Sequence, residues 1–169
     1  MRNKRKMQKI QFVLILIVAA VVGFRAYQAI PDRVGWDFVR FNNAALVPAL
    51  NLMPNSRRFL AAKTDSEMAE AYAVDFVPIY AEKIQRLEAF HPKTREVQRL
   101  RQLYLDSFHA TLQGYLDFTQ AVQVKDPAKR ASSDRELAEG LAKIALARQY
   151  GLAIIKAHHL QFDTNKRKK

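Results

Sequence analysis

Residues 94–124 constrain the fold most, because this long stretch contains no proline and repeats its larger side chains every third or fourth position. Such spacing places these side chains on one face of an α-helix. The sequence therefore predicts a long amphipathic helix over 94–124, whose stripe needs other helices to cover it. The stripe comprises Val97, Leu100, Tyr104, Phe108, Thr111, Tyr115, Phe118 and Val122.

Two further helices are predicted before this one. Residues 36–52 have helical spacing, with Pro48 inside them. Thr64 and Glu67 have the spacing of a capping box, in which the hydroxyl and the carboxylate each bind backbone amides of the first turn. The helix that follows is expected to kink near Val74, because Pro78 removes a hydrogen-bond donor. It is expected to close at His91 and Pro92.

The last predicted helix follows a loop at residues 125–133 and begins with a second capping box at Ser133 and Glu136. Its expected buried stripe is Leu137, Leu141, Ile144, Ala147, Gly151 and Ile154. Arg148 lies at the edge of this stripe. Long amphipathic helices joined by short loops favour an all-α fold, an antiparallel up-down bundle of three to four helices at residues 30–163.

The N-terminal segment is apolar from Ile10 to Phe24 except for Gln11. Lys9 and Arg25 flank this segment, and Tyr27 and Trp36 follow it. We interpret these four as membrane-interface anchors, because such side chains favour the headgroup level. The pattern predicts an uncleaved transmembrane or signal-anchor helix at residues 10–29. A cleaved signal peptide and a soluble core helix remain alternatives.

Basic residues are concentrated at the two ends of the chain. Without five of them in the tip at residues 1–9 and four in the tail at residues 164–169, the net charge falls from +12 to +3. Basic ends beside an apolar segment indicate contact with anionic lipid before nucleic acid. The charge bias predicts a single-pass protein of the bacterial inner membrane, with a cytoplasmic tip and a periplasmic or extracellular C-terminal domain.

No catalytic constellation is recognisable in the sequence. The absence of cysteine excludes disulfides and thiol chemistry, and no phosphate loop or nucleophile motif is present. Glu88 with His91, and Asp106 with His109, have the spacing of di-iron ligands. We expect them at different heights in the bundle, so the sequence predicts a non-enzyme without metal or cofactor.

Gly114 and Gly140 lie at similar distances from the last predicted loop. They are expected at the same height in an antiparallel hairpin. Two missing side chains there allow either close helix packing or space for a small ligand. In the second case Tyr104 and Tyr115 would form the walls of the pocket.

The segments RFNNAALVPALN and YAEKIQRLEAFHPKTREVQRLRQLYLDSFHATLQGYLDFTQAVQVKDP resemble a loose set of uncharacterised bacterial helical-bundle proteins of membrane-anchored or lipoprotein type. The resemblance covers about residues 40–160 and consists of helix and turn patterns. It implies an extracytoplasmic bundle and no catalytic residues. The chain departs from the lipoprotein type because it has no cysteine for lipid attachment.

Together these patterns predict a non-enzymatic, membrane-anchored envelope protein. Its bundle would act by protein–protein contact, as a scaffold, an assembly factor or a sensor-like module, with a partner protein or a second copy of itself. A small-molecule-binding sensor bundle is the first alternative. A basic, cytoplasm-facing domain that binds nucleic acid or lipid is the second.

Overall fold

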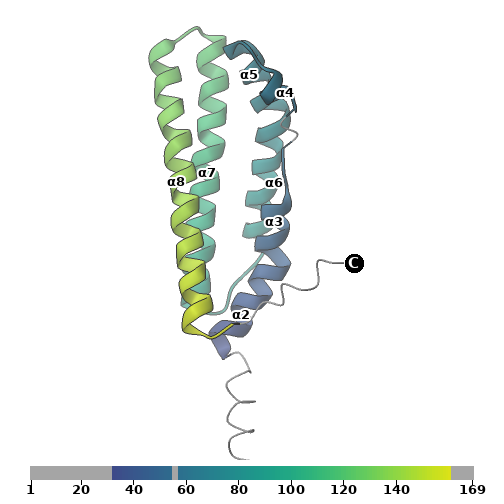
Figure 1. Cartoon of the computed structure of the whole chain (residues 1–169), viewed down its shortest axis with the longest axis vertical. Coiled ribbons are helices and arrows are strands. Elements are labelled where there is room, and N and C mark those ends of the chain that lie inside the picture. The colour runs from purple at the N-terminus through teal and green to yellow at the C-terminus, as the bar shows by residue number, and fades with distance from the viewer. Residues whose placement is uncertain (1–31, 55–56, 161–169) are drawn as a thin grey trace, which may run out of the picture.

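The computed structural model describes residues 32–54 and 57–160, in which every regular element is a helix (Figure 1). The all-α expectation is therefore confirmed for the described residues. In chain order the elements are α2 (Arg33–Phe41), η1 (Asn42–Leu46), α3 (Val47–Asn51), α4 (Arg57–Ala61), α5 (Asp65–Ala71), η2 (Tyr72–Phe76), α6 (Val77–Glu88), α7 (Arg95–Gln123) and α8 (Pro127–Ala157).

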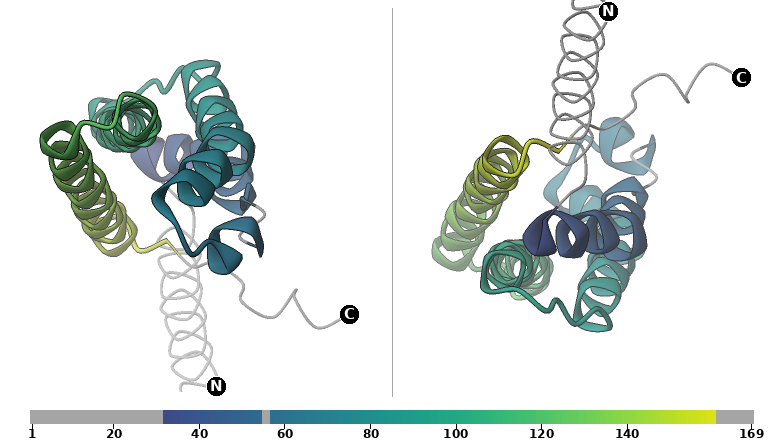
Figure 2. Two further views of the ribbon diagram at one scale, coloured as in Figure 1. Left: turned by 90° about the horizontal axis from the view of Figure 1, so that it is seen from above. Right: turned by 90° about the horizontal axis from the view of Figure 1, so that it is seen from below.

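The two longest helices, α7 and α8, run side by side in opposite directions and form a hairpin (Figure 1). The opposite side of α7 packs on α6, and α3 packs on α6 in turn. Seen along the long axis, α8 stands at the edge of the bundle (Figure 2). It packs mainly on α7 and meets the start of the α2 segment near its own C-terminus, where Asp32 Oδ2 lies 2.7 Å from His158 Nδ1.

The two prolines within helices each follow a π-helical turn. Proline lacks an amide hydrogen, and its ring clashes with the carbonyl four residues earlier in a regular helix. Before Pro48 and Pro78 the helix widens, so that the Val47 amide donates to the Asn42 carbonyl and the Val77 amide to the Tyr72 carbonyl. The kink expected near Val74 thus corresponds to the wide turn η2.

The core lies mainly between α7 and the helices that precede it in the chain. Phe41, Leu87, Leu100, Phe108 and Phe118 are fully buried. Aromatic rings continue this core toward α4 and α5, where Phe59, Tyr72 and Phe76 contact one another. The residues predicted for the stripe of 94–124 therefore form the centre of the bundle, apart from the half-buried Val122.

The helix starts are only partly as predicted. The capping box of Thr64 and Glu67 is confirmed. The prediction of a loop at 125–133 is wrong, because α8 begins at Pro127. Asp126 caps this helix by accepting hydrogen bonds from the amides of Ala128 and Lys129. Ser133 lies inside the helix, where its hydroxyl donates to the Arg130 carbonyl, so the second predicted capping box does not form.

The predicted anchor at residues 10–29, the tip at 1–9 and the tail at 164–169 all lie outside the described residues. Within residues 32–54 and 57–160, no helix has the length and apolar character needed to cross a membrane.

Candidate interaction surface

The contact between α7 and α8 is built mainly on small residues of α8, with Ile154 as the one large side chain among those that α8 buries. Ser133, Gly140, Ala147 and Ile154 are buried at intervals of seven residues and lie on one side of the helix. A Cβ atom added at Gly140 would lie 2.9 Å from the Thr111 nitrogen and 3.1 Å from its Cα. The two backbones therefore approach so closely that no side chain fits at Gly140.

The space beside both glycines is filled by protein. A Cβ atom at Gly114 would meet the Leu137 side chain at 2.8 Å, whereas Gly140 lies against Thr111. The two glycines thus face different partners rather than each other. Tyr104 and Tyr115 are 3% and 8% exposed and pack within the core. This geometry favours close packing over a ligand space at these four residues.

Three tyrosine rings form the centre of the aromatic core. The Tyr115 ring centroid lies 4.6 Å from that of Tyr72 and 5.4 Å from that of Tyr80. Burial raises the pKa of all three phenols. The hydroxyls stay neutral at physiological pH, and those of Tyr80 and Tyr115 are hydrogen-bonded to each other within the core.

Lys83 is a buried basic residue of α6, only 7% exposed. Its Nζ lies 4.8 Å from the Tyr80 ring centroid and 5.5 Å from that of Phe108. Both rings attract the ammonium group, while burial lowers the pKa of Lys83. The long side chain therefore completes the aromatic core rather than forming a separate site.

One flank of α8 is uncovered along most of its length. Leu141 and Leu152 are 55% and 62% exposed, although each is adjacent in sequence to a buried glycine. We define the α8 flank as the exposed residues from Asp134 to Lys156 that directly follow a buried or half-buried residue of α8. They are Asp134, Ala138, Leu141, Ala145, Arg148, Leu152 and Lys156.

The expectation that Leu141 lies on the buried stripe is wrong. Successive residues of a helix point about 100° apart. The close approach at Gly140 turns that residue and Ala147 toward α7, and thereby turns Leu141 to the side. Sequence periodicity missed this surface because Leu137, Leu141 and Ile144 fit one apolar stripe equally well. The contact of Gly140 with Thr111 shows that Leu141 points away from α7, which the spacing alone does not show.

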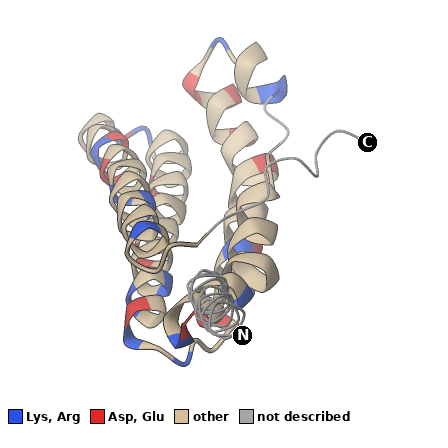
Figure 3. Cartoon of the chain, turned by 60° about the horizontal axis from the view of Figure 1, so that its bottom comes forward, with Lys and Arg blue, Asp and Glu red and all other residues tan. Residues whose placement is uncertain are grey.

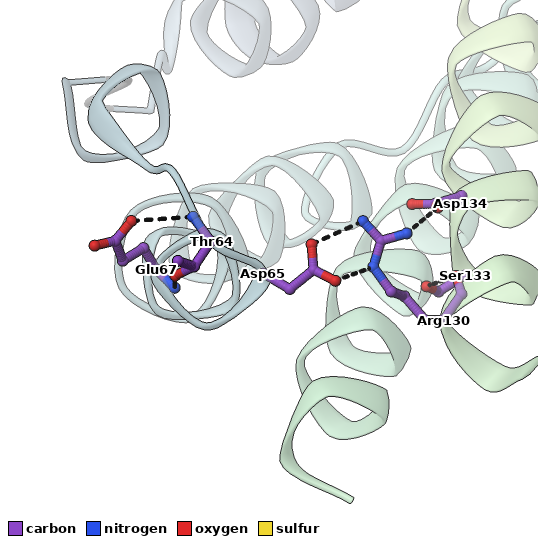
Figure 4. A network of polar contacts seen from close by, with 6 residues as sticks. All are labelled: Thr64, Asp65, Glu67, Arg130, Ser133 and Asp134. Carbon is purple, nitrogen blue, oxygen red and sulfur yellow. Dashed lines mark hydrogen bonds and ion pairs between the residues drawn. The ribbon is translucent and has the colours of Figure 1, made fainter. Parts of the chain in front are cut away.

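The N-terminal end of α8 is fixed to α5 by a polar network around Arg130 (Figure 4). The Arg130 Nε lies 2.6 Å from Asp65 Oδ2, and its Nη1 lies 2.8 Å from Asp134 Oδ2. The guanidinium also lies 4.9 Å from the Phe118 ring centroid. Hydrogen bonding to Asp65 and the charge of Asp134 raise the pKa of Arg130. This contact ties the start of α8 to the start of α5.

An open hollow of about 370 Å³ lies beside this network. Asp65 and Arg130 line it but are paired with each other, and Asp126 is engaged in capping α8. Lys125 contributes the remaining charge. These groups stabilise the end of the hairpin and leave few unpaired polar groups that could bind a ligand.

A carboxyl pair links α7 and α8 on the outside of the hairpin. Burial and a hydrogen bond with Asp117 raise the pKa of Glu136, and the Gln113 amide donates to the Asp117 carboxylate at 3.0 Å. The folded chain therefore binds the Glu136 proton more tightly than the unfolded chain. The resulting stabilisation is complete below the ordinary glutamate pKa and is lost as pH rises through the raised pKa.

Replacing Glu136 with glutamine is accordingly expected to stabilise the chain at neutral pH, by no more than about 1 kcal/mol for groups near the surface. The gain should disappear by about pH 3, below the ordinary glutamate pKa, where Glu136 is protonated in both the folded and the unfolded chain. Urea unfolding at both pH values measures the effect. Glu82→Gln is the control, because Glu82 pairs with Arg86 at 2.6 Å and its loss should give no gain. A gain for Glu136→Gln independent of pH would contradict this assignment.

The histidine and carboxylate motifs do not assemble into a metal centre. Glu88 Oε1 does lie 3.8 Å from His109 Nε2, closer than the expected difference in height suggests. The expected difference in height is wrong, because the end of α6 lies beside the interior of α7, where Arg101 donates hydrogen bonds to the carbonyls of Leu87 and Glu88. Among residues 32–54 and 57–160, however, no group of three or more His, Asp or Glu side chains is placed to hold a metal ion.

The expected membrane-interface residues are only partly visible. Trp36 lies on α2 and is 53% exposed. Lys9, Arg25 and Tyr27 lie outside the described residues.

The described residues form an all-α bundle whose last helix has an exposed outer side that includes the α8 flank. Comparisons with protein-family models, curated proteins and solved structures give no match for it.

Proposed function

We propose that this chain is a non-enzymatic, single-pass membrane protein of the bacterial envelope that binds a protein partner through the α8 flank. The observation that carries the proposal is the exposure of Leu141 and Leu152 on a helix that packs on α7 through an adjacent side. An exposed apolar strip bordered by charges is typical of protein contact sites. The described residues offer no competing catalytic arrangement.

The membrane part of the proposal is supported by sequence alone. Asp32, the first described residue, follows the apolar segment at 10–29 in the sequence and lies next to the C-terminal end of α8. An anchor there would hold this end of the α8 flank near the bilayer. The basic tip favours a cytoplasmic N-terminus and an extracytoplasmic bundle.

Topology can be tested with paired reporters fused to the C-terminus, one active outside the membrane and one inside. We expect the outside signal together with the intact mass of the full chain. An inside signal would refute the orientation. An outside signal from a product shortened by about twenty residues would replace the anchor with a signal peptide.

Docking at the α8 flank can be tested by cysteine labelling, because the chain contains no cysteine of its own. Leu141→Cys and Leu152→Cys are compared with Leu146→Cys, which replaces a leucine 59% exposed on the other side of α8. In native membranes we expect maleimide labelling at 141 and 152 to be about tenfold slower than at 146, the factor equivalent to ~1.4 kcal/mol. Equal rates at all three positions would refute docking at the α8 flank.

A further inference from the structure

The α8 flank has the residue spacing of a helix–helix seam. Its members follow one another at steps of three and four, which is the spacing of a coiled-coil contact. Small and large apolar side chains alternate along it, in the order Ala138, Leu141, Ala145 and Leu152. A helix packed against this flank would therefore contact both protruding leucine side chains and the recesses at the alanines.

Charges divide the flank into two unlike ends. Asp134 lies near its N-terminal end, whereas Arg148 and Lys156 lie toward its C-terminal end. After Glu139 the charged residues of α8 are all basic (Figure 3). The Asp134 side chain remains 49% exposed although it pairs with Arg130. The flank is therefore complementary to a helix with the opposite order of charges.

A second copy of α8 in antiparallel orientation has that order. Antiparallel pairing places Asp134 of each flank toward Lys156 of the other, while parallel pairing places Lys156 against Lys156. Arg148 lies near the centre of the flank and does not distinguish the two orientations, because the two copies of this residue are close in height in both. When Leu141 of one copy faces Leu152 of the other, both exposed leucines are covered in two equivalent contacts. Asp134 then lies within reach of Lys156 of the other copy.

We propose that the partner of the α8 flank is a second copy of this chain, paired antiparallel about a two-fold axis that crosses the flank between Ala145 and Arg148. This inference rests on the proposed function, since it names the partner for the same surface. Such a contact is isologous and closes at the dimer. If both copies are anchored in one membrane, the axis must be perpendicular to the bilayer and the two α8 helices must lie along its surface.

Disulfide formation in the detergent-solubilised full chain tests the orientation. Leu141→Cys and Leu152→Cys variants, tagged to differ in size, are oxidised separately and as a mixture. Residues 141 and 152 are about 16 Å apart along a helix, too far for a bridge between unlike heights. We expect a mixed disulfide dimer from the mixture and little dimer from either variant alone. Leu146→Cys mixed with either variant is the control and should give little product.

A charge exchange tests the register independently. Asp134→Lys should weaken dimerisation about tenfold or more, measured by sedimentation in detergent. Adding Lys156→Glu to the same chain should restore at least part of this loss, because the exchanged charges meet again between copies. Loss of the Arg130 contact within one chain would not be repaired by a change at 156. If the double variant dimerises more weakly than Asp134→Lys alone, the proposed register is wrong.

The other outcomes separate the two proposals. Disulfide dimers from Leu141→Cys alone would overturn the antiparallel arrangement. A monomeric full chain whose flank is nevertheless protected in native membranes would refute the second copy and assign the flank to another protein or to residues 10–29. If another protein covers the flank, the proposed docking function still holds. An unprotected flank in native membranes would refute both proposals.

Discussion

Replacing Gly140 with alanine is expected to destabilise the chain by about 1–3 kcal/mol, the usual cost of overpacking a tight interior contact. The added methyl group would meet the backbone nitrogen and Cα of Thr111 at 2.9 and 3.1 Å, and its hydroxyl oxygen at a still shorter distance. Backbone atoms within a helix cannot move aside individually. The whole of α8 would have to shift away from α7, and the contacts on both sides of Gly140 would loosen.

Gly151→Ala is the matched control on the same helix. Its added Cβ would lie 3.6 Å from the nearest Leu100 methyl carbon, an ordinary van der Waals distance. Alanine is favoured over glycine in a helix interior, so this variant should be stabilised by about 0.5–1 kcal/mol. Opposite shifts of the urea midpoint for the two variants are the expected result. Stabilisation by Gly140→Ala would show that the hairpin is not close-packed there.

Replacing Asp37 with alanine is expected to cost about 2–4 kcal/mol, because a buried hydrogen-bond network loses its acceptor. Asp37 Oδ2 accepts three bonds of 2.8 Å, from the amides of Lys93 and Thr94 and from the Thr94 hydroxyl. Asp37 therefore caps α7 from another helix, while Thr94 makes no cap bond with its own side chain. Without the carboxylate the amide and hydroxyl of Thr94 would be buried without an acceptor, and the partly buried Lys93 amide would lose its acceptor too.

Asp126→Ala provides the comparison for this second prediction. Asp126 caps α8 through two bonds at an exposed site, and its removal should cost about 1 kcal/mol. Urea unfolding measures both losses. Hydrogen exchange at the Lys93 and Thr94 amides should accelerate only in Asp37→Ala. Equal losses from the two variants would mean that water replaces the Asp37 carboxylate at the start of α7.

The periodic stripe explains why most of the bundle was predictable. Leu100, Tyr104, Phe108 and Phe118 follow from helical spacing, and the structure buries all of them. The cap at Thr64 was recognisable because its partner lies only three residues away. The start of α8 was missed because Asp126 and Pro127 form an equally local cap earlier in the chain than the one expected at Ser133.

The exposure of the α8 flank could be recognised only from the tertiary structure. The sequence shows a glycine at position 140. Its contact partner Thr111 lies on another helix, and no local spacing in the sequence links the two residues. Without that partner, the rotation of α8 about its own axis is undetermined, and Leu141 is assigned to the core. The same holds for Asp37 and Thr94, which lie 57 residues apart. Distant capping pairs have no periodic signature.

The sequence by itself determined the helical class, the approximate extent of α7 and the residues that fill its buried stripe. These features depend on interactions within three or four residues, where spacing fixes direction. The tertiary structure decided the rotation of α8, the capping of α7 by Asp37 and the exposure of the α8 flank. These depend on which backbone can approach which other backbone, and such contacts are set by the fold as a whole.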